Sequence, residues 1–97
     1  MTLYRKIYNL KIIEDAAEAL GSSFKGIHAG NFGHLGILSF NANKVITTGS
    51  GGAILCNSKK LNNKIRHLVS TAKVNHPFKF LHSAVGWNYN CLLYTSP

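Results

Sequence analysis

A short apolar run, Leu10–Ile13, limits the fold of this chain most, because it stops abruptly at the acidic pair Glu14-Asp15. The run is too short for a stable helix and is rich in β-branched residues, which is typical of a buried parallel strand. We therefore expect Asp15 to stand at the carboxyl end of a strand. In α/β proteins, that end of the sheet is where ligands bind.

The rest of the chain extends this pattern. Residues 3–9 predict the end of an amphipathic helix, and Ala16–Leu20 predicts a short helical turn closed by Gly21. Glycines between residues 26 and 33 indicate short strands and turns, and further strands are predicted at Leu35–Phe40 and Ala53–Cys56.

A helix with Ser58 as its N-cap is predicted from Lys59 to about Ala72, followed by an aromatic loop. Strands that alternate with helices indicate an α/β layer architecture.

Length and charge narrow the class of protein. A chain of 97 residues can bury only a marginal core. The formal net charge of +8 comes from eleven Lys and Arg against three acids, which leaves a small basic nucleic-acid-binding module as an alternative. The basic residues are dispersed along the chain, however, and do not form a patch. The N-terminus lacks the apolar segment of a signal peptide, and no apolar run is long enough for a membrane span, so we expect a cytoplasmic protein without membrane contact.

Two common kinds of site find little support in the sequence. Cys56 and Cys91 lie far apart and neither belongs to a C-x-x-C pair, and His28 and His34 have no Cys or carboxylate to complete a metal-ligand set. We therefore predict no metal site. The run TTGSGG is rich in glycine but does not match a phosphate-binding P-loop, so we interpret it as a turn.

Three segments in order carry a more specific signal: IIEDAAEALGSSFKG, HAGNFGHLGILSFNANKVITTGSGGAILCN and HSAVGWNYN. They closely resemble successive blocks of the DegT/DnrJ/StrS family of sugar-nucleotide aminotransferases, over residues 8–90. The resemblance implies a fold-type I, pyridoxal-phosphate-dependent enzyme that forms homodimers. Residues 1–90 would then be part of its large, cofactor-binding domain, and residues 91–97 an atypical tail consistent with a truncation artefact.

The resemblance also implies roles for particular residues. Asp15 matches the carboxylate that pairs with the pyridinium nitrogen of pyridoxal 5'-phosphate, where a charge-assisted bond keeps the ring protonated and able to accept electrons. Ser39 and Lys44 match an S-x-x-x-x-K arrangement, in which the hydroxyl binds the cofactor phosphate and the lysine forms the Schiff base and moves the proton. Without the family context, Asp15 would be a helix cap and Lys44 a solvated surface charge.

Two further residues match the family less closely. Glu18 lies three residues after Asp15, where the family has Gln, His or Glu near the cofactor ring; an exposed helix residue is the simpler interpretation. Asn88 matches the asparagine of a G-[aromatic]-N-[aromatic]-R block that reaches the cofactor phosphate of the neighbouring subunit. Asn90 replaces the arginine of that block, and His34 replaces a residue that is acidic in most of the family.

The resemblance implies transfer of an amino group, with glutamate as the expected donor, to a nucleotide-linked 4-keto sugar for surface-glycan or related polysaccharide biosynthesis. A dehydratase or a regulatory relative is the alternative within the family, but dehydratases have His in place of the lysine, and Lys44 argues against them. Because most cofactor contacts of the family lie outside these residues, we expect the 97-residue fragment alone to be inactive and to bind the cofactor weakly.

Overall fold

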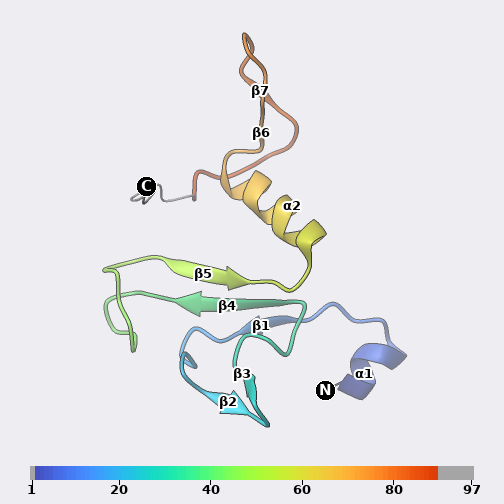
Figure 1. The fold of residues 1–97 in the computed structure, drawn as a ribbon, viewed down its shortest axis with the longest axis vertical. Coiled ribbons are helices and arrows are strands. Elements are labelled where there is room, and N and C mark those ends of the chain that lie inside the picture. The colour runs from blue at the N-terminus through green and yellow to red at the C-terminus, as the bar shows by residue number, and fades with distance from the viewer. Residues whose placement is uncertain (1, 90–97) are drawn as a thin grey trace. The chain divides into compact units, whose positions relative to one another are not determined.

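A computed structural model describes residues 2–89 of the chain, as elements α1, β1–β5, α2, β6 and β7 (Figure 1). The chain divides into two compact units, Met1–Ser58 and Lys59–Pro97, which we describe separately. The prediction that residues 1–90 form part of one large domain stays a prediction. The atypical tail predicted for residues 91–97 and the departure at Asn90 lie outside the described residues.

The first unit contains a three-stranded sheet in the order β1-β4-β5. Strand β1 (Ile13–Asp15) runs parallel to the central strand β4 (Leu35–Ser39), and β5 (Gly52–Leu55) runs antiparallel to β4. The helix α1 (Thr2–Ile7) precedes the sheet and ends where Asn9 adopts a positive φ of 48°. The predicted N-terminal helix and both later strands are therefore confirmed, with shifts of a few residues at their ends. The parallel strand also forms and ends at Asp15 as predicted, but it shares only Ile13 with the apolar run Leu10–Ile13.

Between β1 and β4 the chain forms a hairpin, in which strands β2 (Ser23–Phe24) and β3 (Ile27–His28) pair antiparallel. The short strands and turns predicted for this glycine-rich stretch are confirmed. The predicted helical turn at Ala16–Leu20 is replaced by two successive turns, in which Ala19 N donates to Ala16 O and Ser22 N to Ala19 O. Gly21 still ends this stretch with a φ of 88°, a conformation that favours glycine.

The strand register divides the sheet into two faces. We call one the covered face (Glu14, Gly36, Leu38, Ala53 and Leu55) and the other the open face (Ile13, Asp15, Leu35, Ile37, Ser39 and Ile54). Leu38 on the covered face is buried, whereas Ile13 on the open face is 64% exposed. The prediction that the first strand is buried was therefore wrong, because the described part of this unit packs on the covered face and leaves Ile13 and Asp15 exposed.

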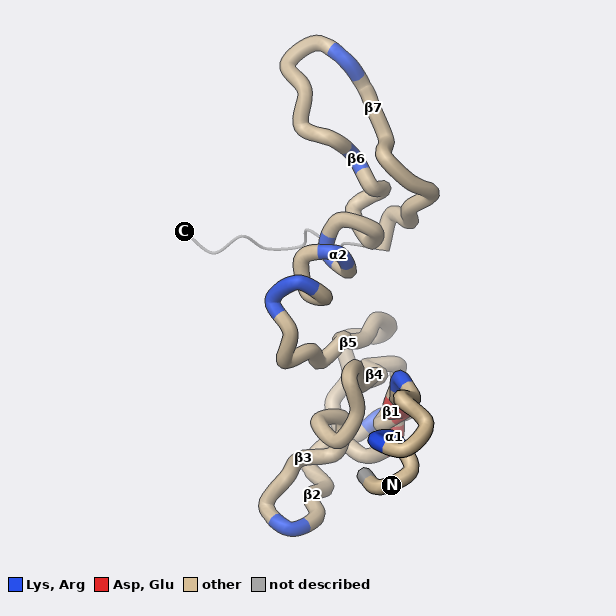
Figure 2. The backbone as a smooth tube through the Cα atoms, turned by 90° about the vertical axis from the view of Figure 1, so that its right-hand side faces the viewer, with Lys and Arg blue, Asp and Glu red and all other residues tan. Residues whose placement is uncertain are grey.

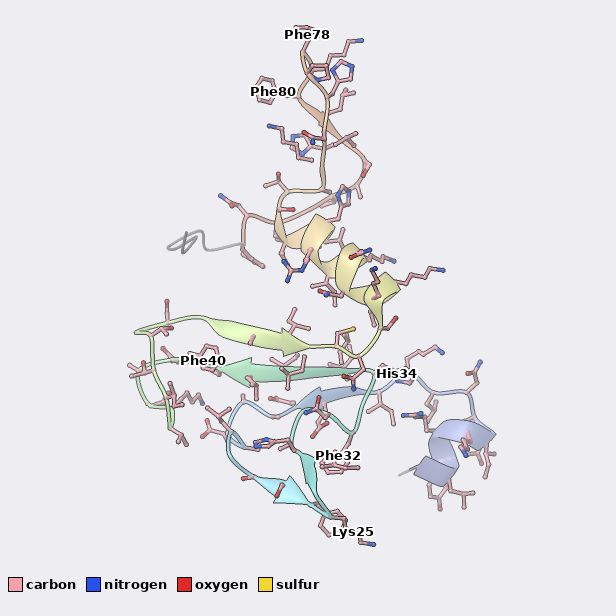
Figure 3. All side chains as sticks on the ribbon, viewed as in Figure 1. Lys25, Phe32, His34, Phe40, Phe78 and Phe80 are labelled. Carbon is pink, nitrogen blue, oxygen red and sulfur yellow. The ribbon has the colours of Figure 1, made fainter. Side chains whose placement is uncertain are left out.

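The second unit consists of α2 (Lys59–Val69) and a hairpin of β6 (Lys73–Val74) and β7 (Leu81–His82). Ser58 directly precedes α2, as predicted for an N-cap residue. The helix ends three residues before the predicted Ala72, because Thr71 and Ala72 adopt positive φ angles of 64° and 51°. The hairpin corrects the prediction of an aromatic loop, and its end carries exposed Phe78 and Phe80 (Figure 3).

Few side chains of either unit are fully enclosed. The buried hydrophobic residues among those described are Ala16, Leu38 and Ala72, so the expectation of a marginal core is confirmed. No helix in the described part of the chain is long and apolar enough to cross a membrane. Lys and Arg occur in both units rather than in one cluster, whereas the acids gather at and just after β1 (Figure 2).

Candidate functional site

The candidate site lies where β1 and β4 end. Because the two strands are parallel, their carboxyl ends meet at the same edge of the sheet. Asp15 is the last residue of β1, and Ser39 is the last residue of β4, two positions beyond Ile37, the register partner of Asp15. The alternation of side chains puts Asp15 and Ser39 on the same open face. The structure thus brings together two residues that are 24 positions apart in the sequence.

Each of these two side chains has a local backbone contact. Asp15 Oδ1 accepts a hydrogen bond from Ala17 N at 3.1 Å, which shapes the turn after β1. Ser39 Oγ accepts one from Asn41 N at 3.4 Å at the start of the following loop. Asp15 is exposed and Ser39 is half-buried, so a ligand at this edge could reach both.

Lys44 lies in the loop that connects β4 to β5. This loop is closed at its base by bonds from Phe40 N to Gly51 O, at 2.9 Å, and from Thr48 N to Phe40 O, at 3.0 Å. Within the loop, Lys44 N donates to Asn41 O at 3.0 Å. The side chain of Lys44 is only 13% exposed, although the loop around it is largely open to solvent. A covered lysine is unusual, because burial costs its charge much of its hydration.

The amine of Lys44 forms an ion pair and hydrogen bond with the carboxylate of Glu18. Glu18 comes from the turn after β1 and is itself 77% exposed. The contact links the two loops that follow the two parallel strands. It brings two of the predicted residues into direct contact and gives Glu18 a partner that a helix-surface position would not provide.

These groups form a donor and acceptor set that suits pyridoxal phosphate. A carboxylate can pair with a protonated ring nitrogen, a hydroxyl can donate to a phosphate oxygen, and an amine can bond to an aldehyde carbon. Asp15, Ser39 and Lys44 supply these three groups at one edge of the sheet. The residues present therefore fit the cofactor that the sequence led us to expect.

Asn88 belongs to the second unit. Its backbone forms an isolated β-bridge with Ser70, just beyond the end of α2. On either side of it, Trp87 N donates to Leu68 O at 2.8 Å and Tyr89 N donates to Val69 O at 2.9 Å. These bonds satisfy carbonyl groups in the last turn of the helix. They hold the backbone around Asn88 in place and leave its side chain exposed.

The glycine run after Lys44 is a turn, as predicted. Gly49 and Gly51 adopt positive φ angles of 84° and 115°, and Gly49 N donates to Thr47 Oγ1 at 2.9 Å. Among residues 2–89, no group of three His, Cys, Asp or Glu side chains is close enough to hold a metal ion. His34, which was considered as a metal ligand, instead accepts a hydrogen bond at Nδ1 from Ile12 N, at 3.0 Å.

Sequence reasoning missed one residue beside the site, Glu14. Its carboxylate accepts hydrogen bonds from the backbone of Gly30, Phe32 and Gly33. These bonds, with that from Gly30 the strongest cause, lower the pKa of Glu14 from its ordinary value. The glycines of this stretch were visible in the sequence, but nothing there linked them to Glu14.

Comparison with known proteins shows which proteins this chain is similar to. The chain is 42% identical over 84 residues to the GDP-perosamine synthase of Escherichia coli O157:H7, which covers 87% of this chain and 23% of that protein. It is 48% identical over 65 residues to the UDP-4-amino-4,6-dideoxy-N-acetyl-beta-L-altrosamine transaminase of Campylobacter jejuni, covering 67% of this chain and 17% of that protein.

Among solved structures, PseC of Helicobacter pylori, an aminotransferase involved in the biosynthesis of pseudoaminic acid, superposes with a TM-score of 0.83 at 29% identity. The superposition covers 92% of this chain and 24% of that one. The chain thus spans between 17% and 24% of the length of these three proteins. Its fold is part of the α/β domain of a pyridoxal-phosphate-dependent aminotransferase. Because the model of the DegT/DnrJ/EryC1/StrS aminotransferase family matches residues 3–92, the chain belongs to that family.

Proposed function

We propose that these residues are part of an aminotransferase that uses pyridoxal phosphate to transfer an amino group, with glutamate as the donor, to a nucleotide-linked 4-keto sugar. Enzymes of this family depend on pyridoxal phosphate. The observation that carries the proposal is the meeting of Asp15, Ser39 and Lys44 at the carboxyl edge of β1 and β4. The two relatives are named for GDP- and UDP-linked amino sugars, which supports a nucleotide sugar as the substrate class.

In this proposal each residue has a separate task. When bound, the cofactor supplies an electron-accepting ring that stabilises negative charge at the substrate carbon. Asp15 holds a proton on the ring nitrogen through a charge-assisted hydrogen bond. Ser39 donates to the phosphate and, with Asn88, orients it, Asn88 acting from the neighbouring subunit of a homodimer. Lys44 Nζ would hold the cofactor through its aldehyde carbon. When displaced, the amine would take a proton from the carbon that bears the amino group of the donor and deliver it to the cofactor.

The Lys44–Glu18 contact adds a detail to this scheme. An amine must lose its proton before it can act as a nucleophile or a base. The Glu18 carboxylate contacts the amine of Lys44 where the two loops meet. In the proposed site, Glu18 orients this amine and lies beside the cofactor ring.

The experiment that tests the proposal uses the longer protein, obtained by extending the coding sequence in both directions. The protein is saturated with pyridoxal phosphate, reduced with borohydride and digested, and the modified peptide is identified by mass spectrometry. We expect a phosphopyridoxyl group on Lys44 and its loss in Lys44→Arg. Lys25→Arg is the matched control, because Lys25 lies in the exposed turn between β2 and β3 (Figure 3) and should leave the modification unchanged.

An unmodified Lys44 in a folded, cofactor-saturated protein would contradict the proposal and favour a regulatory relative. The substrate is tested separately, by following amino transfer from glutamate to GDP-, UDP- and dTDP-linked 4-keto-6-deoxy sugars. We expect one nucleotide sugar to be aminated and the reaction to be absent in Lys44→Arg. Salt-dependent binding to DNA or RNA, with no cofactor uptake, would instead support the nucleic-acid alternative.

A further inference from the structure

Glu14 precedes Asp15 in β1, and its side chain points to the opposite face of the sheet. Its two carboxylate oxygens accept three backbone hydrogen bonds from one loop. Gly30 N donates to Oε1 at 2.7 Å, Phe32 N donates to Oε2 at 2.8 Å, and Gly33 N donates to Oε2 at 3.3 Å. Charge-assisted bonds of this kind are about twice as strong as neutral ones. Three backbone amides of the loop therefore share the Glu14 side chain as their hydrogen-bond acceptor.

The loop that Glu14 holds lies directly against the covered face. A methyl group added at Gly30 would meet Leu55 Cδ1 at 2.8 Å and Ala16 Cβ at 3.7 Å, so Gly30 lies against both side chains. A methyl group at Gly36 would collide with the backbone of Gly30. The loop thus packs on the sheet at backbone distance, with no side chain between them. Figure 3 shows Phe32 and His34 in the stretch that leads from this loop into β4.

This contact reaches the proposed site through Ala16. Ala16 is the residue after Asp15, is 2% exposed, and donates its backbone N–H to Ile37 O at 2.9 Å. Gly30 is a near neighbour of Ala16, since a methyl group added at Gly30 would lie 3.7 Å from Ala16 Cβ. The loop 30–33 therefore lies next to the backbone that follows Asp15. This backbone also forms the turn in which Ala17 N donates to Asp15 Oδ1.

We infer that Glu14 is a positioning residue for Asp15: by binding the loop 30–33 it presses Gly30 against Ala16 and sets where the Asp15 carboxylate lies at the sheet edge. Glu14 is assigned no contact with a reacting atom, because its side chain lies on the face opposite to Asp15 and Ser39. The inference rests on the proposed function, since it assigns Asp15 to the ring nitrogen. It adds Glu14 to the residues that determine the geometry of the site. The lowered pKa of Glu14 agrees with a carboxylate that stays ionised here.

The alternative is that Glu14 only stabilises the fold. A fold-stabilising residue would affect unfolding but would not change how a folded protein binds the cofactor. A positioning residue would change both the affinity for the cofactor and the absorbance of its ring, because that absorbance depends on the proton that Asp15 holds. Misplacing a functional group by even 1 Å can cost up to about a hundredfold in function.

The test compares Glu14→Gln with Asn31→Ala in the longer protein. Gln keeps one acceptor oxygen but presents an NH₂ group to amides that need an acceptor. Asn31 is the matched control, because it lies in the same loop with an exposed side chain, and the bond from its backbone N to His28 O, at 3.1 Å, does not involve that side chain. Hydrogen exchange of Gly30, Phe32 and Gly33 amides is measured first, without cofactor. We expect exchange about tenfold faster in Glu14→Gln and unchanged in Asn31→Ala.

Pyridoxal phosphate is then titrated into each protein well below its unfolding temperature. We expect Glu14→Gln to bind about tenfold more weakly and to show an altered visible absorbance band, while Asn31→Ala matches the wild type. If Glu14→Gln does not fold, Glu14→Asp takes its place, because it keeps the charge but shortens the reach by one methylene. For this variant we expect a smaller loss of affinity in the same direction.

A folded Glu14 variant that binds the cofactor as tightly as the wild type, with the same absorbance, overturns the inference and leaves the proposed function intact. Unchanged amide exchange in the loop overturns it as well. A wild-type protein that takes up no cofactor overturns the proposed function, and with it any role of Glu14 toward that cofactor. The wild-type titration thus tests the proposed function, and the comparison of Glu14→Gln with the wild type tests the role of Glu14.

Discussion

Replacing Gly36 by Ala is the sharpest test of how the loop 30–33 packs on the sheet. The new methyl carbon would overlap Gly30 O and would lie 2.5 Å from Gly30 C and 2.6 Å from Gly30 Cα, whereas ordinary contacts begin at 3.4 Å. Because both partners are backbone, no side chain can rotate away. The loop and β4 must instead separate by at least about 0.9 Å, which would stretch the bond from Gly30 N to Glu14 from 2.7 Å to about 3.6 Å or more, beyond good hydrogen-bond length.

The expected cost combines two effects. Overpacking costs about 1–3 kcal/mol, and a lost hydrogen bond to a charged group costs about 1.5–3 kcal/mol, so we expect Gly36→Ala to lower the free energy of unfolding by about 2.5–6 kcal/mol. Such a loss is a large part of the roughly 5–15 kcal/mol that stabilises a typical domain. Urea unfolding followed by far-UV circular dichroism measures it in the longer protein.

Gly21→Ala is the control, because an added methyl group there meets no atom within 4 Å. Its φ of 88° still makes Ala unfavourable, at a cost of about 1–2 kcal/mol. We expect Gly36→Ala to be clearly the more destabilising of the two. If it changes the unfolding free energy by less than Gly21→Ala does, the close packing of the loop on the sheet is refuted.

Three other substitutions test single contacts. His34→Ala removes the acceptor of the Ile12 N–H, so we expect a loss of about 1–3 kcal/mol in urea unfolding, while His34→Asn, which offers an oxygen, should lose less; equal losses would argue against the contact. Since the pKa of Glu14 is lowered in the folded chain, its contribution to stability is present above the ordinary carboxyl value of 4.5 and is lost as the pH falls through the lowered value. Unfolding of Glu14→Gln should therefore depend less on pH below 4.5, and an identical acid profile would contradict this. Gly86→Ala would place a methyl group 2.8 Å from Leu68 O, so we expect a loss of about 1–3 kcal/mol, with a change in tryptophan fluorescence as the end of α2 is disturbed; an unchanged unfolding midpoint would refute it.

Much of the fold follows from local patterns. The apolar run before Asp15, the strand ahead of Lys44 and the helix after Ser58 all have the spacing of the elements that form, since periodicity and β-branching act within a few residues. The wrong element ends came from contacts between residues far apart in the sequence. The helix α2 ends at Val69 because Thr71 takes a left-handed conformation as the chain returns along the helix end, which no spacing in the sequence predicts.

Residues of the candidate site divide in the same way. Asp15, Ser39, Lys44 and Asn88 were identified from motif blocks, and their roles stay predictions. The contact between Lys44 and Glu18 was not predicted, because the two residues are 26 positions apart and only the parallel pairing of β1 with β4 brings their loops to one edge.

The sequence by itself determined the family, the α/β class and the chemical groups available, because motif residues and local periodicity are properties of the chain alone. The tertiary structure decided which groups meet. It put Asp15 on the open face and Glu14 on the covered face, since neighbouring side chains of a strand point in opposite directions. It then gave Glu14 three amide partners from a loop 16 to 19 residues away, because hydrogen bonds follow distance in space rather than separation along the chain.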